Sequence, residues 1–87
     1  MDDEEIMADI MNKLFRRSCW GAKYLPLDTL VNWLSKKIKK NGKRVDRIIK
    51  YLVSEGYLIT HNKGKTVSLS HRKSREIVEF IKRFVGF

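Results

Sequence analysis

The sequence predicts a small α+β protein, with helices and a small antiparallel sheet in the order α-β-α-α-β-β-α. In several segments apolar residues recur at three- and four-residue spacing, as on the buried face of amphipathic helices. After Gly56 the spacing changes to two, which is typical of strands. Of the 87 residues, 43% are hydrophobic and 33% are charged, which suits one hydrophobic core. We therefore expect a single domain over residues 1–87.

The first helix is expected from about Glu4 to Arg17, overlapping an acidic leader at residues 1–5. Asp2 and Asp3 suit its N-cap and first turn, because a carboxylate accepts the free N–H groups there and opposes the positive end of the helix dipole. Its predicted core face consists of Ile6, Met7, Ile10, Met11, Leu14 and Phe15.

A short extended segment and a second helix follow. Gly21 breaks the helical period, and Tyr24-Leu25 is expected to be extended up to Pro26. Asp28 is a candidate N-cap for the second helix. Its predicted core residues are Leu30, Val31, Leu34 and Ile38. A polar turn over residues 39–42 is expected to end this helix, with Gly42 taking the positive φ of a helix stop.

The third helix is predicted from Lys43 to about Glu55, with Gly56 as its stop signal. One apolar stripe is formed by Val45, Ile48, Ile49, Leu52 and Val53. At 100° per residue, the face opposite this stripe carries Lys43, Arg47, Lys50 and Ser54, with Arg44 and Tyr51 on its flank. The exposed face of this helix is therefore expected to be basic.

The last third of the chain predicts a hairpin and a final helix. Residues 57–60 and 66–70 are rich in β-branched and aromatic side chains, and a polar five-residue loop, 61–65, separates them. The final helix is expected over residues 72–85, with apolar positions at Ile77, Phe80, Ile81, Phe84 and Val85.

The charge is distributed unevenly along the chain. The formal net charge is +9, but five of the ten acids lie in the first nine residues. Residues 10–87 carry all 19 basic side chains against five acids, a net charge of +14. Between Lys36 and Lys50 eight residues are basic and only Asp46 is acidic. Such an imbalance attracts polyanions, and nucleic acid is the commonest polyanion in a cell.

Two segments resemble the winged helix-turn-helix family, and the order of elements fits that family over nearly the whole chain. Residues 45–59 resemble its recognition helix running into a Leu-x-x-x-Gly-Tyr-Leu-Ile junction, and residues 24–30 resemble its short strand and second-helix start. The resemblance implies a helix-turn-helix over residues 28–55 and a wing hairpin over 57–70, with the short strand paired to the wing.

The resemblance also implies how DNA would be bound. The third helix would lie in the major groove and the wing would contact phosphate or the minor groove. Carried over by position, the groove-facing residues are Lys43, Arg44, Arg47 and Lys50, and the wing contacts are Lys63 and Lys65. Side-chain chemistry agrees, because the planar guanidinium of Arg47 can engage guanine O6 and N7, whereas lysines act chiefly as charges toward phosphate. The expected flanking phosphate contacts are Lys36, Lys37, Lys39 and Lys40.

These observations predict a duplex-DNA-binding protein, a small transcriptional regulator that reads the major groove with helix 43–55 and contacts the backbone with the wing, 61–65. Two alternatives stay open. The chain could be a ribosomal or other RNA-binding winged-helix protein, which would rely on phosphates and 2′-hydroxyls. It could also be a protein-interaction module in which the acidic leader shields the basic face. The apolar terminal helices could form a homodimer or complete the core of a monomer.

Other classes of function have little support in the sequence. We expect no enzyme, because no nucleophile has an evident base partner and no glycine-rich phosphate loop is present. We expect no cofactor and no metal, since Cys19, His61 and His71 lack any recognised ligand spacing. No apolar stretch approaches the length of a membrane span, and the acidic N-terminus is unlike a secretory signal, so we expect no membrane partner and a cytoplasmic location. Trp20 and Trp33 are expected to serve the core or its edge.

Overall fold

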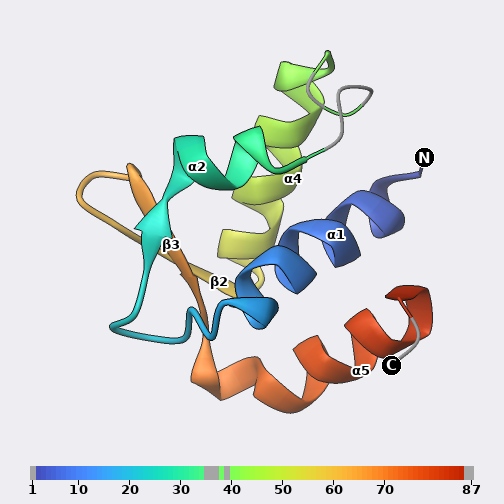
Figure 1. Cartoon of the computed structure of the whole chain (residues 1–87), viewed down its shortest axis with the longest axis vertical. Coiled ribbons are helices and arrows are strands. Elements are labelled where there is room, and N and C mark those ends of the chain that lie inside the picture. Colours follow the sequence, from blue (N-terminus) through green and yellow to red (C-terminus); the bar gives the residue numbers. More distant parts are fainter. Residues whose placement is uncertain (1, 35–37, 39, 86–87) are drawn as a thin grey trace.

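The computed structural model describes residues 2–34, 38 and 40–85, which form helices around a small antiparallel sheet (Figure 1). The elements in chain order are α1 (Asp3–Arg16), β1 (Leu25–Pro26), α2 (Leu27–Asn32), α4 (Gly42–Ser54), β2 (Leu58–His61), β3 (Thr66–Leu69), a 3₁₀ turn (His71–Lys73) and α5 (Ser74–Val85). The predicted α+β class is confirmed.

The sheet has three strands in the order β1-β3-β2, all antiparallel. The hairpin of β2 and β3 places Leu58 opposite Leu69, and β1 joins the other edge of β3 by pairing Leu25 with Val67. All four of these side chains are buried. The short strand therefore pairs with the hairpin, as the resemblance implied, but it consists of Leu25 and Pro26, one residue later than the expected Tyr24-Leu25.

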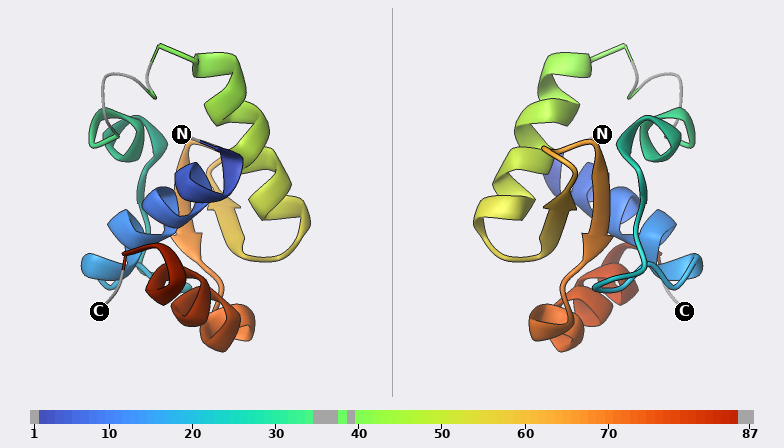
Figure 2. Two further views of the ribbon diagram at one scale, coloured as in Figure 1. Left: turned by 90° about the vertical axis from the view of Figure 1, so that its right-hand side faces the viewer. Right: turned by 90° about the vertical axis from the view of Figure 1, so that its left-hand side faces the viewer.

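One continuous apolar core lies between the helices and the sheet. Helix α1 contacts α5, α4 and β3, and α4 also packs on β2. In both views of Figure 2, α4 stands at the outer edge of the molecule, with one flank turned inward and the other uncovered. The most deeply buried side chains include Ile6, Ile10, Leu14, Leu30, Ile48, Leu52, Val67, Leu69, Ile77 and Ile81.

The expected start of the first helix is confirmed in detail. Asp2 is the N-cap, and its Oδ1 accepts a hydrogen bond from the backbone N–H of Glu5 at 2.9 Å. Asp3, Glu4 and Glu5 occupy the first turn, where negative charge is favourable. The helix spans residues 3–16, within one residue of the expected bounds at each end.

The expectation that Asp28 caps the second helix is wrong. Helix α2 begins at Leu27 after Pro26 in the N-cap position, and no side chain caps it. The backbone N–H of Leu27 instead donates to the carbonyl oxygen of Lys65 at 2.8 Å, so the hairpin supplies the partner. Asp28 lies in the first turn. The helix ends at Asn32, before the expected end; residues 35–37 and 39 lie outside the described residues.

The role expected of Gly42 is also wrong. Gly42 is the first residue of α4 and does not have a positive φ. A helix start accepts any residue with ordinary helical angles, so nothing at this position requires glycine. Gly56 behaves as expected, with a φ of 83° directly after α4.

These two glycines give a matched test of the backbone conformation. Gly56→Ala is expected to lower the free energy of unfolding by about 1 kcal/mol or more, because an L side chain disfavours positive φ. The added methyl would only make an ordinary contact at 3.7 Å with Cε of Lys73, so the backbone angle dominates. Gly42→Ala is expected to raise it by about 0.5 kcal/mol, since alanine lowers the entropy of the unfolded chain. Urea denaturation measures both, and equal losses would contradict the described conformations.

Candidate nucleic-acid interface

The packing of α4 decides which of its side chains reach solvent. Val45, Ile48, Ile49 and Leu52 are buried against the core. Lys43, Arg47 and Lys50 lie on the opposite side and are exposed, with 69% of the Arg47 side chain and 77% of the Lys50 side chain accessible. The predicted basic face of this helix is therefore present on the surface.

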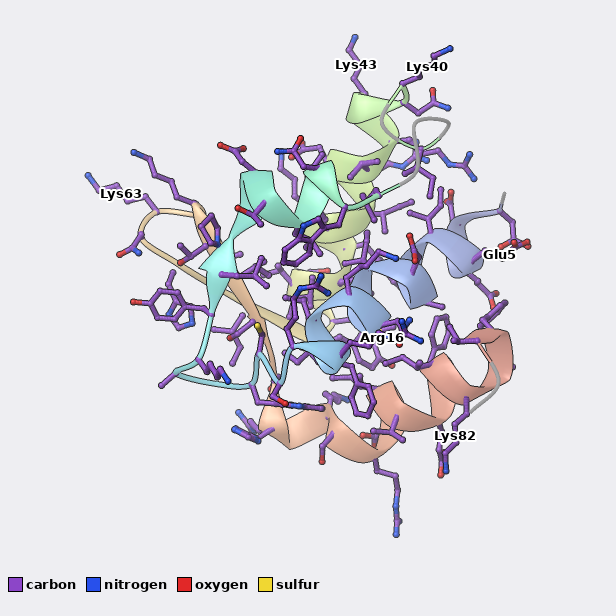
Figure 3. All side chains as sticks on the ribbon, in the orientation of Figure 1. Glu5, Arg16, Lys40, Lys43, Lys63 and Lys82 are labelled. Atoms are coloured by element: carbon purple, nitrogen blue, oxygen red, sulfur yellow. The ribbon has the colours of Figure 1, made fainter. Side chains whose placement is uncertain are left out.

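Positive charge also gathers where α4 begins. Lys40 and Lys43 project from the same end of the molecule in Figure 3, and the first turn of α4 contains no acidic residue. The helix dipole adds partial positive charge at this end, so the lysines and the dipole favour the same kind of ligand, an anion. Lys36, Lys37 and Lys39, expected to extend this group, lie outside the described residues.

Lys50, one of the predicted contact residues, forms an ion pair with an acid on the same helix. Nζ of Lys50 lies 3.0 Å from Oδ2 of Asp46, one helical turn earlier. Both side chains are largely exposed, so water screens the pair and its contribution to stability is small. The i,i+4 spacing of an acid and a lysine was the sequence signal for this pair. Asp46 thus places one negative charge on the otherwise basic face.

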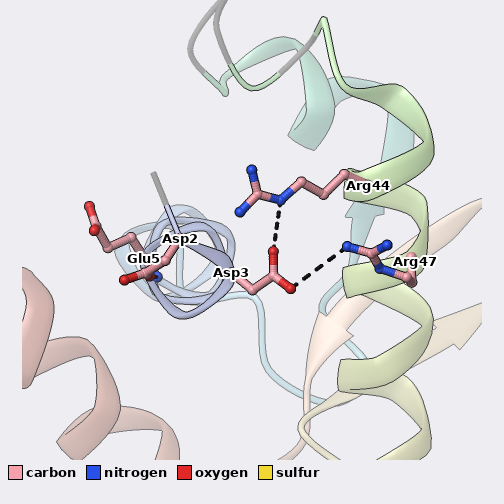
Figure 4. A network of polar contacts seen from close by, with 5 residues as sticks. All are labelled: Asp2, Asp3, Glu5, Arg44 and Arg47. Atoms are coloured by element: carbon pink, nitrogen blue, oxygen red, sulfur yellow. Dashed lines mark hydrogen bonds and ion pairs between the residues drawn. The ribbon is translucent and has the colours of Figure 1, made fainter.

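The two arginines of α4 meet an acid from the other end of the chain (Figure 4). Nε of Arg44 donates to Oδ1 of Asp3 at 2.7 Å, and an Nη of Arg47 lies 3.7 Å from Oδ2 of the same carboxylate. Arg44 is the less accessible of the two, with 30% of its side chain exposed. No local pattern in the sequence connects Asp3 to these arginines, because they are brought together only by the packing of α1 on α4.

The hairpin carries a second group of basic residues. Its tip turns through Asn62, Lys63 and Gly64, all at positive φ, and Lys63 and Lys65 are exposed. In Figure 3 Lys63 projects from the hairpin tip, well apart from Lys40 and Lys43. The structure therefore arranges the described residues that were predicted to contact DNA as two groups, one at and along α4 and one on the hairpin loop.

An aromatic stack lies at the end of the hairpin that adjoins its loop. The rings of Tyr24 and His61 stack with centroids 4.6 Å apart, and His61 Nε2 lies 3.5 Å from Oγ of Ser68. The Ser68 hydroxyl donates to the carbonyl oxygen of Gly21 at 2.7 Å. These contacts join the segment before β1 to the hairpin.

Both tryptophans are partly buried and pack against the core, as expected. Trp20 stacks on His71 with centroids 5.5 Å apart, and the guanidinium carbon of Arg17 lies 3.5 Å from the Trp33 ring centroid. At least one face of each ring is therefore already covered within the chain.

Much of the apolar surface of the terminal helices is used within the chain. Helices α1 and α5 pack on each other, and Ile77 and Ile81 of α5 are fully buried. Phe84 and Val85 at the end of α5 remain exposed. These two residues are what the described part of α5 offers to a second copy, and the homodimer stays a prediction.

Within the described residues, no three His, Cys, Asp or Glu side chains are close enough together to hold a metal ion. Nor does any helix in this part of the chain have the length and apolar character needed to cross a membrane. The chain matches no family model, no curated protein and no solved structure.

Cys19 follows α1 in the chain and is buried, with 5% of its surface accessible. Burial raises the pKa of its thiol above the ordinary value, and the nearby Lys23 and Arg17 only partly oppose this. A buried neutral thiol is a poor nucleophile, so Cys19 acts here as a small apolar side chain.

This raised pKa predicts a pH dependence of stability. Above about pH 8.5 the unfolded thiol ionises while the folded one keeps its proton, so the unfolded state is favoured as the pH rises. The free energy of unfolding of the wild type is expected to fall between pH 8 and 10 more steeply than that of Cys19→Ala. Urea denaturation across this range measures the difference, and parallel curves would show that Cys19 is not held in its neutral form.

Proposed function

We propose that this chain is a winged helix-turn-helix domain that binds duplex DNA and serves as a small transcriptional regulator. The observation that carries the proposal is the exposed basic face of α4, formed by Lys43, Arg47 and Lys50 opposite a buried apolar stripe. In this proposal α4 is the recognition helix and the β2–β3 hairpin is the wing.

The arrangement of elements supports this assignment. Helix α2 precedes α4, the hairpin follows α4 directly, and β1 completes the sheet along the free edge of β3. A helix of 13 residues, about 20 Å long, fits the major groove of B-DNA, which is about 12 Å wide. The wing, with Lys63 and Lys65, is of a size to reach the flanking backbone.

The proposal gives separate roles to the basic side chains. Arg47 is the best candidate for reading a base, because its guanidinium is largely exposed and presents two parallel donors to guanine. Lys40, Lys43 and Lys50 are assigned to phosphates, which fix register without reading sequence. Arg44, half-buried beside Asp3, is assigned to the edge of the groove.

A fluorescence-anisotropy titration tests the proposal. Labelled random duplex DNA, structured RNA and duplexes enriched by selection are titrated at several salt concentrations. We expect binding to duplex DNA that weakens with salt, and a preferred sequence that is retained as salt rises. Preference for RNA would favour the RNA-binding alternative. Loss of binding to every polymer near physiological salt would favour a protein-interaction module.

Arg47→Ala is expected to weaken binding to the selected site by about 5- to 150-fold and to reduce discrimination between that site and random DNA, because a bidentate contact to a base contributes about 1–3 kcal/mol. Lys82→Ala is the control, since this exposed lysine of α5 lies at the opposite end of the molecule from Lys43 in Figure 3. If Arg47→Ala leaves both the affinity for DNA and the discrimination between sites unchanged, the assignment of α4 as the recognition helix is wrong.

Lys63→Ala and Lys65→Ala in the wing are expected to weaken binding to all duplexes by a similar factor. Each should also reduce the slope of log affinity against log salt concentration by about 0.9, the value for one lost phosphate contact. The same titrations measure both quantities. A change in sequence preference without a change in salt slope would mean that the wing reads bases.

Dimerisation through α1 and α5 is a separate prediction. Sedimentation equilibrium of the wild type and Phe84→Ser measures it. The variant replaces an exposed apolar residue of α5, so it is expected to dimerise more weakly than the wild type. A monomer at all concentrations would contradict the prediction, and Phe84 and Val85 would then be exposed residues of a monomer.

A further inference from the structure

A single carboxylate at the start of α1 is bound by both arginines of α4 (Figure 4). Asp3 accepts a hydrogen bond from Nε of Arg44 at 2.7 Å through Oδ1 and faces an Nη of Arg47 at 3.7 Å through Oδ2. Asp2 and Glu5, also drawn there, point away from the arginines. The contact is therefore particular to Asp3 and is not shared by the acids drawn beside it.

The carboxylate presents to these arginines the same chemistry as a phosphate of the DNA backbone. Both groups are anions that accept charge-assisted hydrogen bonds from guanidinium N–H groups. Asp3 uses the Nε–H of Arg44 and places a negative charge beside Arg47 on the flank of α4. With 46% of its side chain exposed, Asp3 lies where a polyanion approaching that flank meets it.

We propose that Asp3 is an internal competitor for the nucleic acid: its carboxylate holds Arg44 and restrains Arg47, and a phosphate must displace it to bind either arginine from this flank. The inference rests on the function proposed above and adds a means by which the affinity for nucleic acid is limited. Its consequence is that the wild-type protein binds more weakly than its basic charge allows, and that release of Asp3 raises affinity.

The alternative is that the ion pair of Asp3 with the arginines only stabilises the packing of α1 on α4. Loss of a purely structural ion pair would change the free energy of unfolding. It would not raise the affinity for DNA beyond the effect of one lost negative charge. Glu4→Gln provides the matched control for Asp3→Asn. Glu4 lies in the same first turn and is exposed, and no ion pair joins it to the described residues. Each variant removes one negative charge, and Asp2 remains as the N-cap.

The first measurement needs no nucleic acid. In the NMR spectrum of arginine side chains, the Nε–H signal of Arg44 is expected to move in Asp3→Asn and to stay in place in Glu4→Gln. Circular dichroism checks that both variants keep their helices. If the Arg44 signal does not move in Asp3→Asn, the contact is absent in solution and the proposal is overturned.

The second measurement is anisotropy titration of random duplex DNA with wild type and both variants. Asp3→Asn is expected to bind about 5-fold more tightly than wild type, the upper end for an exposed ion pair, and Glu4→Gln less than about 2-fold more tightly. In a background with Arg44→Gln and Arg47→Gln, the gain from Asp3→Asn is expected to fall to that of Glu4→Gln.

The outcomes separate this inference from the proposed function. Wild-type binding with equal gains, or no gain, in the two variants overturns the competitor and leaves the proposed function standing. If Asp3→Asn binds duplex DNA and the wild type and Glu4→Gln do not, the result supports Asp3 as the competitor. If neither wild type nor Asp3→Asn binds duplex DNA or structured RNA, the proposed function fails and the competitor fails with it.

Discussion

The burial of one apolar stripe of α4 is the interaction on which the rest of the structure depends. Val45, Ile48, Ile49 and Leu52 are each at most 5% exposed, and full burial of such a side chain contributes about 1.5–3 kcal/mol. Rotating the helix by one residue would turn charged side chains toward the core. The stripe therefore fixes the rotation of α4, and the same constraint holds Lys43, Arg47 and Lys50 in solvent.

The hairpin is positioned by a second set of constraints. Leu58, Val67 and Leu69 are buried beneath the helices, while the carbonyl oxygen of Lys65 receives the N–H of Leu27. The loop that carries the exposed lysines is thus tied to α2 at its base. Two basic groups, on α4 and on the hairpin, are consequently presented by elements packed on one core.

Much of this fold could be predicted from local patterns, and the failures have definite physical causes. The stripe of α4, the Asp2 cap and the stop at Gly56 each depend on residues close in sequence. The prediction for Asp28 failed because a distant carbonyl, that of Lys65, took the place of a side-chain cap. Gly42 was misplaced because a turn glycine and a helix-start glycine look alike in sequence.

The candidate site likewise combines features that local sequence predicts with a contact that only the packing of the chain creates. The basic face of α4 follows from helical periodicity, and the Asp46–Lys50 pair could have been recognised from its spacing. The contact between Asp3 and Arg44 joins residues 41 positions apart and depends wholly on how α1 packs against α4. Charge counted along the chain therefore overstates the charge that this surface offers to a ligand.

The central claim is that duplex DNA is bound by the exposed face of α4 together with the hairpin. Its most direct test is to titrate a short duplex into ¹⁵N-labelled protein and to follow the backbone amide signals by NMR. The account predicts the largest shifts at residues 40–50 and 61–66, with little change along α5. Shifts confined to α1 and α5, or none at duplex concentrations that suffice for non-specific binding, about 10⁻⁴ M, would contradict it.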